Sequence, residues 1–137
     1  MNKPNIVTIP SKMERYYGEG TMLHPTIGII SEAILLIPKG QVTTIEHLGH
    51  KLAKDFKVNI TCPMRIGNSI KKIAKSNQLS DSNIPYWRVL RKDQLMIKTS
   101  TLEYDAVKVE KEGFELSFLK SGNIKVLFEK EELFTFE

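Results

Sequence analysis

The stretch of sequence that decides how this chain is interpreted is Ile84-Pro85-Tyr86-Trp87-Arg88-Val89-Leu90-Arg91. It contains the single tryptophan of the chain next to a tyrosine, and it places two arginines three residues apart. Aromatic rings stack on bases and on guanidinium groups, and guanidinium groups pair with phosphates, so this composition suits a surface that binds nucleic acid. The same pattern also fits a buried edge strand with a tryptophan in the core. The surrounding sequence is needed to choose between these interpretations.

Length and composition indicate a globular domain. The chain has 137 residues, 41% of them hydrophobic, which is enough to bury a substantial core. A single cysteine excludes an internal disulfide and fits a reducing compartment. The longest apolar run, residues 27–37, contains polar interruptions and is too short to span a bilayer. We therefore expect a soluble, monomeric protein of the cytoplasm with no membrane partner.

The basic residues are concentrated in the middle of the chain. Residues 39–98 hold twelve Lys or Arg against four Asp or Glu, whereas residues 99–137 hold five against nine, and the net charge is +4. A positive middle is typical of a domain with a phosphate-binding face. A solvated helix face without any partner would give the same counts.

Hydrophobic spacing predicts two helices, one just before the basic region and one at its start. The first, over residues 25–37, has Pro25 in its first turn and a buried stripe that includes Leu35 and Leu36. The second begins at a capping box, Thr43-Thr44-Ile45-Glu46, in which a threonine hydroxyl accepts a free backbone N–H and the glutamate reaches back. It ends near Phe56.

A third helix, over residues 62–77, is predicted to be apolar on one face and polar on the other. Four polar residues recur at helical intervals on the second face: Arg65, Asn68, Lys72 and Lys75. A capped helix, a turn and a second helix with a basic face follow the helix-turn-helix plan. In that plan the second helix presents its N-terminal residues to a groove of DNA.

The remaining segments predict mixed structure. Residues 87–90 and 95–97 suggest a small hairpin or wing, residues 101–112 a helix that stops at Gly113, and residues 114–128 a second hairpin. Residues 1–24 are weakly patterned, and we expect an irregular arm packed on the domain. The expected organisation is thus an arm (1–24), a DNA-binding domain (25–98) and a C-terminal extension of the same domain (99–137).

Three segments resemble motifs of the DNA-binding domain of the O6-alkylguanine-DNA alkyltransferases, and they occur in the same order and with the same spacing as in that family. Ile37-Pro38-Lys39-Gly40-Gln41-Val42-Thr43-Thr44 resembles the motif I-P-x-G-x-V-x-T/S that begins this domain. Ile66-Gly67-Asn68-Ser69-Ile70-Lys71-Lys72 is similar to its glycine-containing recognition helix, and Ile84-Pro85-Tyr86-Trp87-Arg88-Val89 resembles the active-site segment Ile-Pro-Cys-His-Arg-Val. The resemblance covers residues 25–98, and the tail after Thr99 resembles extensions found in cysteine-free relatives.

The resemblance implies a winged helix-turn-helix that binds the minor groove of DNA. In the family, an arginine of the recognition helix replaces a flipped alkylguanine in the base stack, and a cysteine in a neighbouring pocket takes the alkyl group irreversibly. Here Tyr86 stands at the cysteine position and Trp87 at the position of the histidine that helps to activate it. A phenol with a pKa of about 10 is a poor nucleophile at neutral pH, so the family's alkyl transfer is not expected.

The chain is therefore most similar to the alkyltransferase-like branch, whose members lack the cysteine, bind the damaged base and flag it for other repair proteins. Those proteins usually carry tryptophan and then histidine at this point, whereas this chain has Tyr86 and then Trp87. Tryptophan is larger than histidine, and Trp87 would therefore fill the pocket. Alignment on Gly67 places Met64 at the intercalating position, and a shift of one residue gives that role to Arg65. The tyrosine that helps to rotate the target nucleotide corresponds to Ile45, which the helix pattern assigns to the core.

A cysteine-dependent enzyme is the competing interpretation. Cys62 lies at a predicted helix N-terminus, which would lower its pKa, and His47 and His50 lie on the preceding helix. However, Cys62 aligns with the apolar face of its helix, where a structural role is favoured. The histidines and the cysteine show no metal-ligand spacing, and we expect neither a metal nor a cofactor.

The sequence thus predicts an α+β, winged helix-turn-helix protein with a C-terminal β-hairpin extension. We expect a non-catalytic binder of alkylated or distorted double-stranded DNA that works with repair proteins. The predicted DNA-binding residues are Thr43, Thr44, Met64, Arg65, Asn68, Lys72, Arg88 and Arg91, and the predicted pocket residues are Tyr86 and Trp87. A winged-helix regulator or architectural protein is the first alternative, and alkyl transfer through Cys62 is the second.

Overall fold

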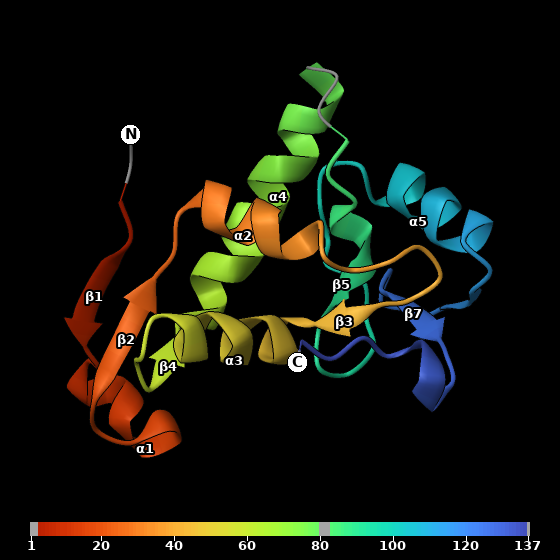
Figure 1. Cartoon of the computed structure of the whole chain (residues 1–137). Coiled ribbons are helices and arrows are strands. Elements are labelled where there is room, and N and C mark those ends of the chain that lie inside the picture. The colour runs from red at the N-terminus through yellow and green to blue at the C-terminus, as the bar shows by residue number, and fades with distance from the viewer. Residues whose placement is uncertain (1–2, 80–82, 137) are drawn as a thin grey trace.

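Three helices enclose the main apolar core, in the order that the sequence predicts. They are α2 (Ile27–Ile34), α3 (Ile45–Asp55) and α4 (Pro63–Leu79), and they lie in the middle of the computed structural model (Figure 1). The structure describes residues 3–79 and 83–136. Buried residues of all three helices, among them Ile30, Leu48 and Ile70, form one cluster with Tyr86.

Threonine side chains define the starts of α2 and α3. Thr26 accepts a backbone N–H of the first turn of α2 at 3.2 Å, so Pro25 lies before the N-cap and not in the helix as predicted. Thr44 accepts the backbone N–H of His47 at 3.2 Å, which makes His47 the third residue of α3. The predicted capping box with Glu46 is therefore wrong by one residue.

The end of α2 also differs from the prediction. The helix ends at Ile34. The amide of Leu35 still bonds four residues back, to Ser31, but those of Leu36 and Ile37 bond three residues back, to Ala33 and Ile34, which tightens the last turn. Leu35 and Leu36 are consequently 57% and 55% exposed. The prediction that they widen a buried stripe is wrong.

Residues 5–24 form ordered structure where the sequence predicted an irregular arm. Strands β1 (Asn5–Thr8) and β2 (Thr21–His24) pair antiparallel, and β2 pairs in parallel with β4 (Ile60–Thr61) just before α4. The connection between β1 and β2 contains η1 (Ser11–Met13) and α1 (Glu14–Tyr17). This three-stranded sheet lies beside the N-terminal end of α4 (Figure 1).

The stretch around Trp87 forms a turn followed by a very short strand. A 3-10 helix, η2 (Tyr86–Arg88), precedes β5 (Val89–Leu90), which pairs in parallel with β3 (Thr43–Thr44). The predicted strand is therefore present only in its second half. A single bridge between Leu90 and Met96 closes the predicted small hairpin.

The C-terminal part builds a second core on the other side of β5. It comprises α5 (Leu102–Lys111), the hairpin β6 (Glu115–Phe118) and β7 (Ile124–Leu127), and η3 (Lys130–Glu132). The predicted helix and hairpin are both present, and Gly113 ends α5 with a φ of +105°, a conformation that glycine adopts without strain. The last residues return to the first core, where Phe134 donates its N–H to Val42 at 2.7 Å.

No helix among the described residues combines the length and the apolar character that crossing a membrane requires.

Candidate nucleic-acid interface

One face of α4 is exposed and rich in basic residues. Ile66, Ile70 and Ile73 are buried in the core, as the helical spacing predicts. Seven residues of the helix are exposed among those whose burial is described: Met64, Arg65, Asn68, Lys71, Lys72, Lys75 and Ser76. No Asp or Glu occurs in this helix, so the exposed face has a positive charge.

A hollow of about 470 Å³, the β5-side hollow, lies along one flank of this face. Three basic side chains line it: Lys71 from α4, and Arg91 and Lys98 from the segment after β5. Arg91 also forms an ion pair with Asp93 at 3.3 Å, but both side chains are about half exposed and the pair is weak. Arg91 therefore remains available to a ligand phosphate.

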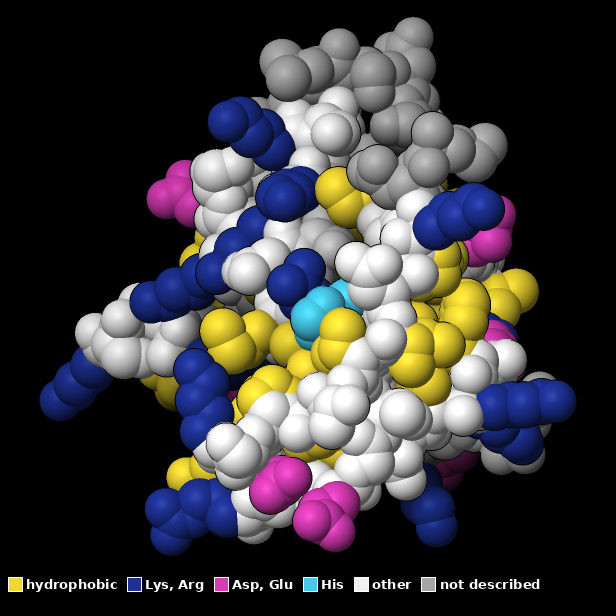
Figure 2. Space-filling model, turned by 90° about the vertical axis from the view of Figure 1, so that its left-hand side faces the viewer, with side chains coloured by type: hydrophobic (Ala, Val, Ile, Leu, Met, Phe, Trp, Pro, Cys, Tyr) yellow, Lys and Arg dark blue, Asp and Glu magenta, His cyan; other side chains and the backbone are white. Residues whose placement is uncertain are grey.

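A larger groove of about 640 Å³, the β2-side groove, lies along the other flank. It is bounded by α4 and the N-terminal sheet, and its basic side chains are Lys3, Arg65 and Lys72. His24 also lines it, and burial, with a smaller contribution from the charge of Arg65, lowers the pKa of this histidine. Figure 2 shows this side of the molecule, on which many Lys and Arg side chains gather.

Met64 and Asn68 line both the hollow and the groove. They therefore form a ridge along α4 with basic residues on each side. Met64 is 71% exposed, which is unusual for a large apolar side chain. Of the residues predicted to bind DNA, the structure brings together Met64, Arg65, Asn68, Lys72 and Arg91 on this surface.

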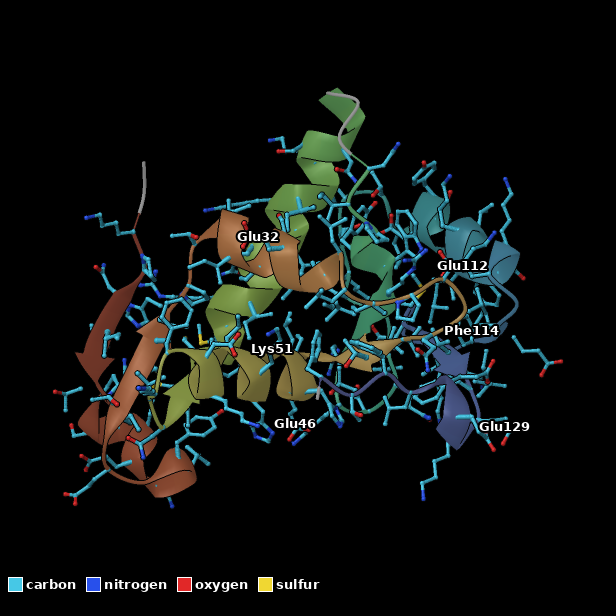
Figure 3. All side chains as sticks on the ribbon, viewed as in Figure 1. Glu32, Glu46, Lys51, Glu112, Phe114 and Glu129 are labelled. Carbon is cyan, nitrogen blue, oxygen red and sulfur yellow. The ribbon has the colours of Figure 1, made fainter. Side chains whose placement is uncertain are left out.

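Arg88 does not belong to that surface. Its guanidinium pairs with Glu112 at 2.9 Å and donates to the carbonyl of Ile37 at 2.8 Å, and the two charged side chains are only 14% and 7% exposed. Glu112 lies at the end of α5 beside the loop that follows α2 (Figure 3) and also accepts the indole N–H of Trp87 at 2.8 Å. The prediction of Arg88 as a DNA contact is wrong, because its charge is used to join α5 to the first core.

Thr43 and Thr44 are also used inside the protein. Thr43 is completely buried and donates its hydroxyl to the carbonyl of Phe134 at 2.8 Å. Thr44 is 7% exposed and caps α3, as described above. Neither side chain is accessible to DNA, so both of these predictions are wrong.

Tyr86, one of the two predicted pocket residues, is buried in the first core beside α4. It is 2% exposed, and its hydroxyl contacts Thr101 at 3.1 Å and donates to Asp105. Burial, and then the hydrogen bond to Asp105, raise the pKa of Tyr86 well above its usual range. The phenol is therefore neutral at physiological pH.

The space left between Tyr86 and its neighbours is small. A void of about 10 Å³, bordered by Ile70, Trp87 and Met96, has room for one water molecule at most. Tyr86 and Trp87 also border a larger hollow, of about 360 Å³, together with Tyr104 and Lys108. The role of Tyr86 and Trp87 in binding a base remains a prediction.

Cys62 is placed as a core residue. It is 6% exposed and packs with Ile9 and Met22 between the N-terminal sheet and α4. Across residues 3–79 and 83–136, no cluster of His, Cys, Asp and Glu is arranged to hold a metal ion. The surroundings of Cys62 therefore favour a structural role.

Comparison with known proteins supports the fold. No protein-family model and no curated protein matches the chain. Two solved structures match over 80% of this chain and 94% of theirs, each with 18% sequence identity. They are S. pombe Atl1 in complex with damaged DNA containing O6-carboxymethylguanine, with a TM-score of 0.56, and S. pombe ATL in complex with DNA, with a TM-score of 0.59. The chain thus has an α+β fold shared with alkyltransferase-like proteins, as the sequence predicts.

Proposed function

We propose that this protein binds duplex DNA without performing a reaction on it and takes part in DNA repair, as alkyltransferase-like proteins do. The observation that carries the proposal is the ridge of Met64 and Asn68 on α4, with basic residues on both flanks. A duplex presents a groove between two phosphate backbones, and such a ridge complements it in shape and in charge. S. pombe Atl1, which shares this fold, has been crystallised with damaged DNA.

Each exposed residue of the interface has a chemical role in this proposal. Arg65 and Lys72 pair with phosphates on one flank, and Arg91 pairs with phosphates on the other. Asn68, on the ridge itself, is placed to hydrogen-bond with base edges or sugars.

Met64 is the residue that we assign as the wedge. It lies on the ridge and is 71% exposed, whereas Arg65 lines only the β2-side groove. Several minor-groove binders insert an apolar side chain between base pairs and thereby kink the duplex. Met64 thus serves in place of an arginine, and Arg65 contacts the backbone beside it.

The properties of Tyr86 are the reason why we propose no transfer of an alkyl group to this position. A nucleophile at this position must be deprotonated, but burial and Asp105 raise the pKa of the Tyr86 hydroxyl and keep it protonated. The hydroxyl also donates its hydrogen to the carboxylate of Asp105. A base bound near this residue would not be altered.

The small void beside Tyr86 favours a second candidate function, duplex binding without recognition of a flipped base. About 10 Å³ cannot hold a purine, so a base would have to lie in the hollow of about 360 Å³ beside Tyr104 and Lys108, or Tyr86 or Trp87 would have to move. If these residues stay in place, the protein is an architectural or regulatory DNA binder.

A titration with two duplexes tests both candidates. The fluorescence of Trp87, the single tryptophan, is followed as matched duplexes with and without one O6-methylguanine are added. Lesion recognition predicts at least about tenfold tighter binding to the lesion duplex. Equal affinities with a steep salt dependence would favour the architectural function. No binding of either duplex at low salt would overturn the proposal.

A further inference from the structure

The β2-side groove, of about 640 Å³, cannot be formed by the exposed face of α4 alone. One of its walls is α4. The other comes from the N-terminal sheet through Asn5, Met22 and His24, from Lys3 just before β1, and from residues 25–27 at the start of α2. It therefore depends on a part of the chain whose pattern predicted only an irregular arm.

The N-terminal sheet is held firmly against the start of α4. β2 pairs with β4, the N–H of Cys62 donates to Leu23 at 3.0 Å, and the side chain of Asn59 accepts the N–H of Thr21 at 2.9 Å. Ile9, Met22 and Cys62 pack together beneath these bonds. The groove is consequently a fixed feature of the surface, since both walls belong to one hydrogen-bonded and packed unit.

The charge of the groove is uniformly positive or neutral. Its lining contains Lys3, Arg65 and Lys72 with the polar groups of Asn5 and Asn68, and none of its described lining residues is acidic. The ion pairs found among the described residues join Lys51 to Asp55, Arg88 to Glu112 and Arg91 to Asp93. The three cations of the groove have no such pair within the described part of the chain.

The position of the groove determines which strand of a bound duplex its cations contact. It lies on the opposite side of the Met64–Asn68 ridge from the β5-side hollow. When the ridge enters a groove of DNA, one backbone runs along each flank, and the two backbones are the two strands of the duplex. The β2-side groove then faces the strand that the β5-side hollow does not contact.

We propose that the N-terminal sheet is a second DNA-binding element, and that the β2-side groove holds the sugar–phosphate backbone of one strand through Lys3 together with Arg65 and Lys72. This inference rests on the proposed function, since it extends the same interface. It assigns a DNA-binding role to residues outside the segment that resembles the alkyltransferase DNA-binding domain.

Salt-dependent binding tests the role of Lys3. The probe is a fluorescein-labelled, undamaged duplex of about two helical turns, and the observed affinity is measured by anisotropy at several salt concentrations. Affinity falls as salt is added, and removing one phosphate contact makes the plot of log affinity against log salt concentration less steep by about 1. We expect this decrease for Lys3→Gln. Lys12→Gln serves as the matched control, because Lys12 is exposed in η1 and does not line the groove.

Lys71→Gln separates this inference from the proposed function, because Lys71 lines only the β5-side hollow. A weaker salt dependence of binding for Lys71→Gln, with an unchanged salt dependence for Lys3→Gln, would overturn the role of the sheet and leave α4 as the interface. Equal decreases for Lys3→Gln and Lys12→Gln would also overturn it, since the effect would then be one of net charge. A wild-type protein that does not bind the duplex would refute the proposed function itself.

Discussion

The hydroxyl of Tyr86 donates a hydrogen bond to the carboxylate of Asp105, and both side chains are almost completely buried. Thr99 and Thr101 donate to the same carboxylate, at 2.5 and 3.0 Å. Burial raises the pKa of Asp105, and burial and Asp105 together raise that of Tyr86. At the position that resembles the reactive cysteine of the alkyltransferases, this chain therefore has a neutral residue that ties η2 to α5.

Replacing Tyr86 by phenylalanine should destabilise the protein without changing its affinity for undamaged DNA. The variant leaves Asp105 buried with one donor fewer, which costs about 1–3 kcal/mol of the free energy of unfolding. Urea denaturation measures this cost. Tyr104→Phe is the control, because Tyr104 is 53% exposed and its replacement should change stability by no more than about 0.5 kcal/mol. Equal stabilities of wild type and Tyr86→Phe would show that the hydroxyl does not hold η2 to α5.

Removing the negative charge of Glu112 should be far more damaging than removing a surface charge. Glu112→Gln leaves the guanidinium of Arg88 buried without its counter-ion, and breaking such a pair costs about 3–5 kcal/mol. In Asp93→Asn, which breaks the exposed pair with Arg91, the cost should stay below about 1 kcal/mol. Chemical denaturation compares the two. A similar small loss in both variants would contradict the structural role of Arg88, which would then be open again as a DNA contact.

Met64→Ala and Arg65→Ala should weaken DNA binding in different ways. An apolar wedge contributes stacking and no charge, so Met64→Ala should lower the affinity by about tenfold and leave its salt dependence unchanged. Arg65→Ala should make the plot of log affinity against log salt concentration less steep by about 1. Anisotropy titrations at several salt concentrations distinguish these effects. An unaltered affinity for Met64→Ala would remove it as the wedge.

Incubation with DNA that contains O6-methylguanine should leave the mass of the protein unchanged. Tyr86 is protonated and hydrogen-bonded, and Cys62, which borders the β2-side groove, is only 6% exposed and packs with Ile9 and Met22, so we expect neither to accept an alkyl group. Intact mass spectrometry provides the measurement. A gain of one methyl group that disappears in Cys62→Ser would instead establish alkyl transfer to Cys62.

The parts of the fold that local patterns determine could be predicted from the sequence. The apolar spacing of α3 and α4, the polar face of α4 and the hairpin of β6 and β7 were all expected in these places, and the fold class is confirmed. Helical periodicity and turn residues lie within a short window of sequence, so they can be recognised without knowing the partner of each segment.

The features that depend on distant partners could not be predicted. β1 and β2 have four residues each, and β2 pairs with β4, which lies more than thirty residues further along the chain. Arg88 meets Glu112 across 24 residues, and Thr43 meets Phe134 across 91. The sequence around Arg88 and Thr43 suits a surface contact equally well, and only their partners show that they serve the core.

The most direct test of the central claim is the DNA affinity of Lys72→Glu, since Lys72 is an exposed cation of the proposed interface. Lys120→Glu is the matched control, because Lys120 is exposed in the turn between β6 and β7 and lines neither the groove nor the hollow. We predict that Lys72→Glu weakens binding to every duplex by about tenfold or more at low salt while the protein remains as stable as the wild type. Lys120→Glu should bind as the wild type does. An affinity of Lys72→Glu equal to that of the wild type would show that α4 is not the face that binds DNA.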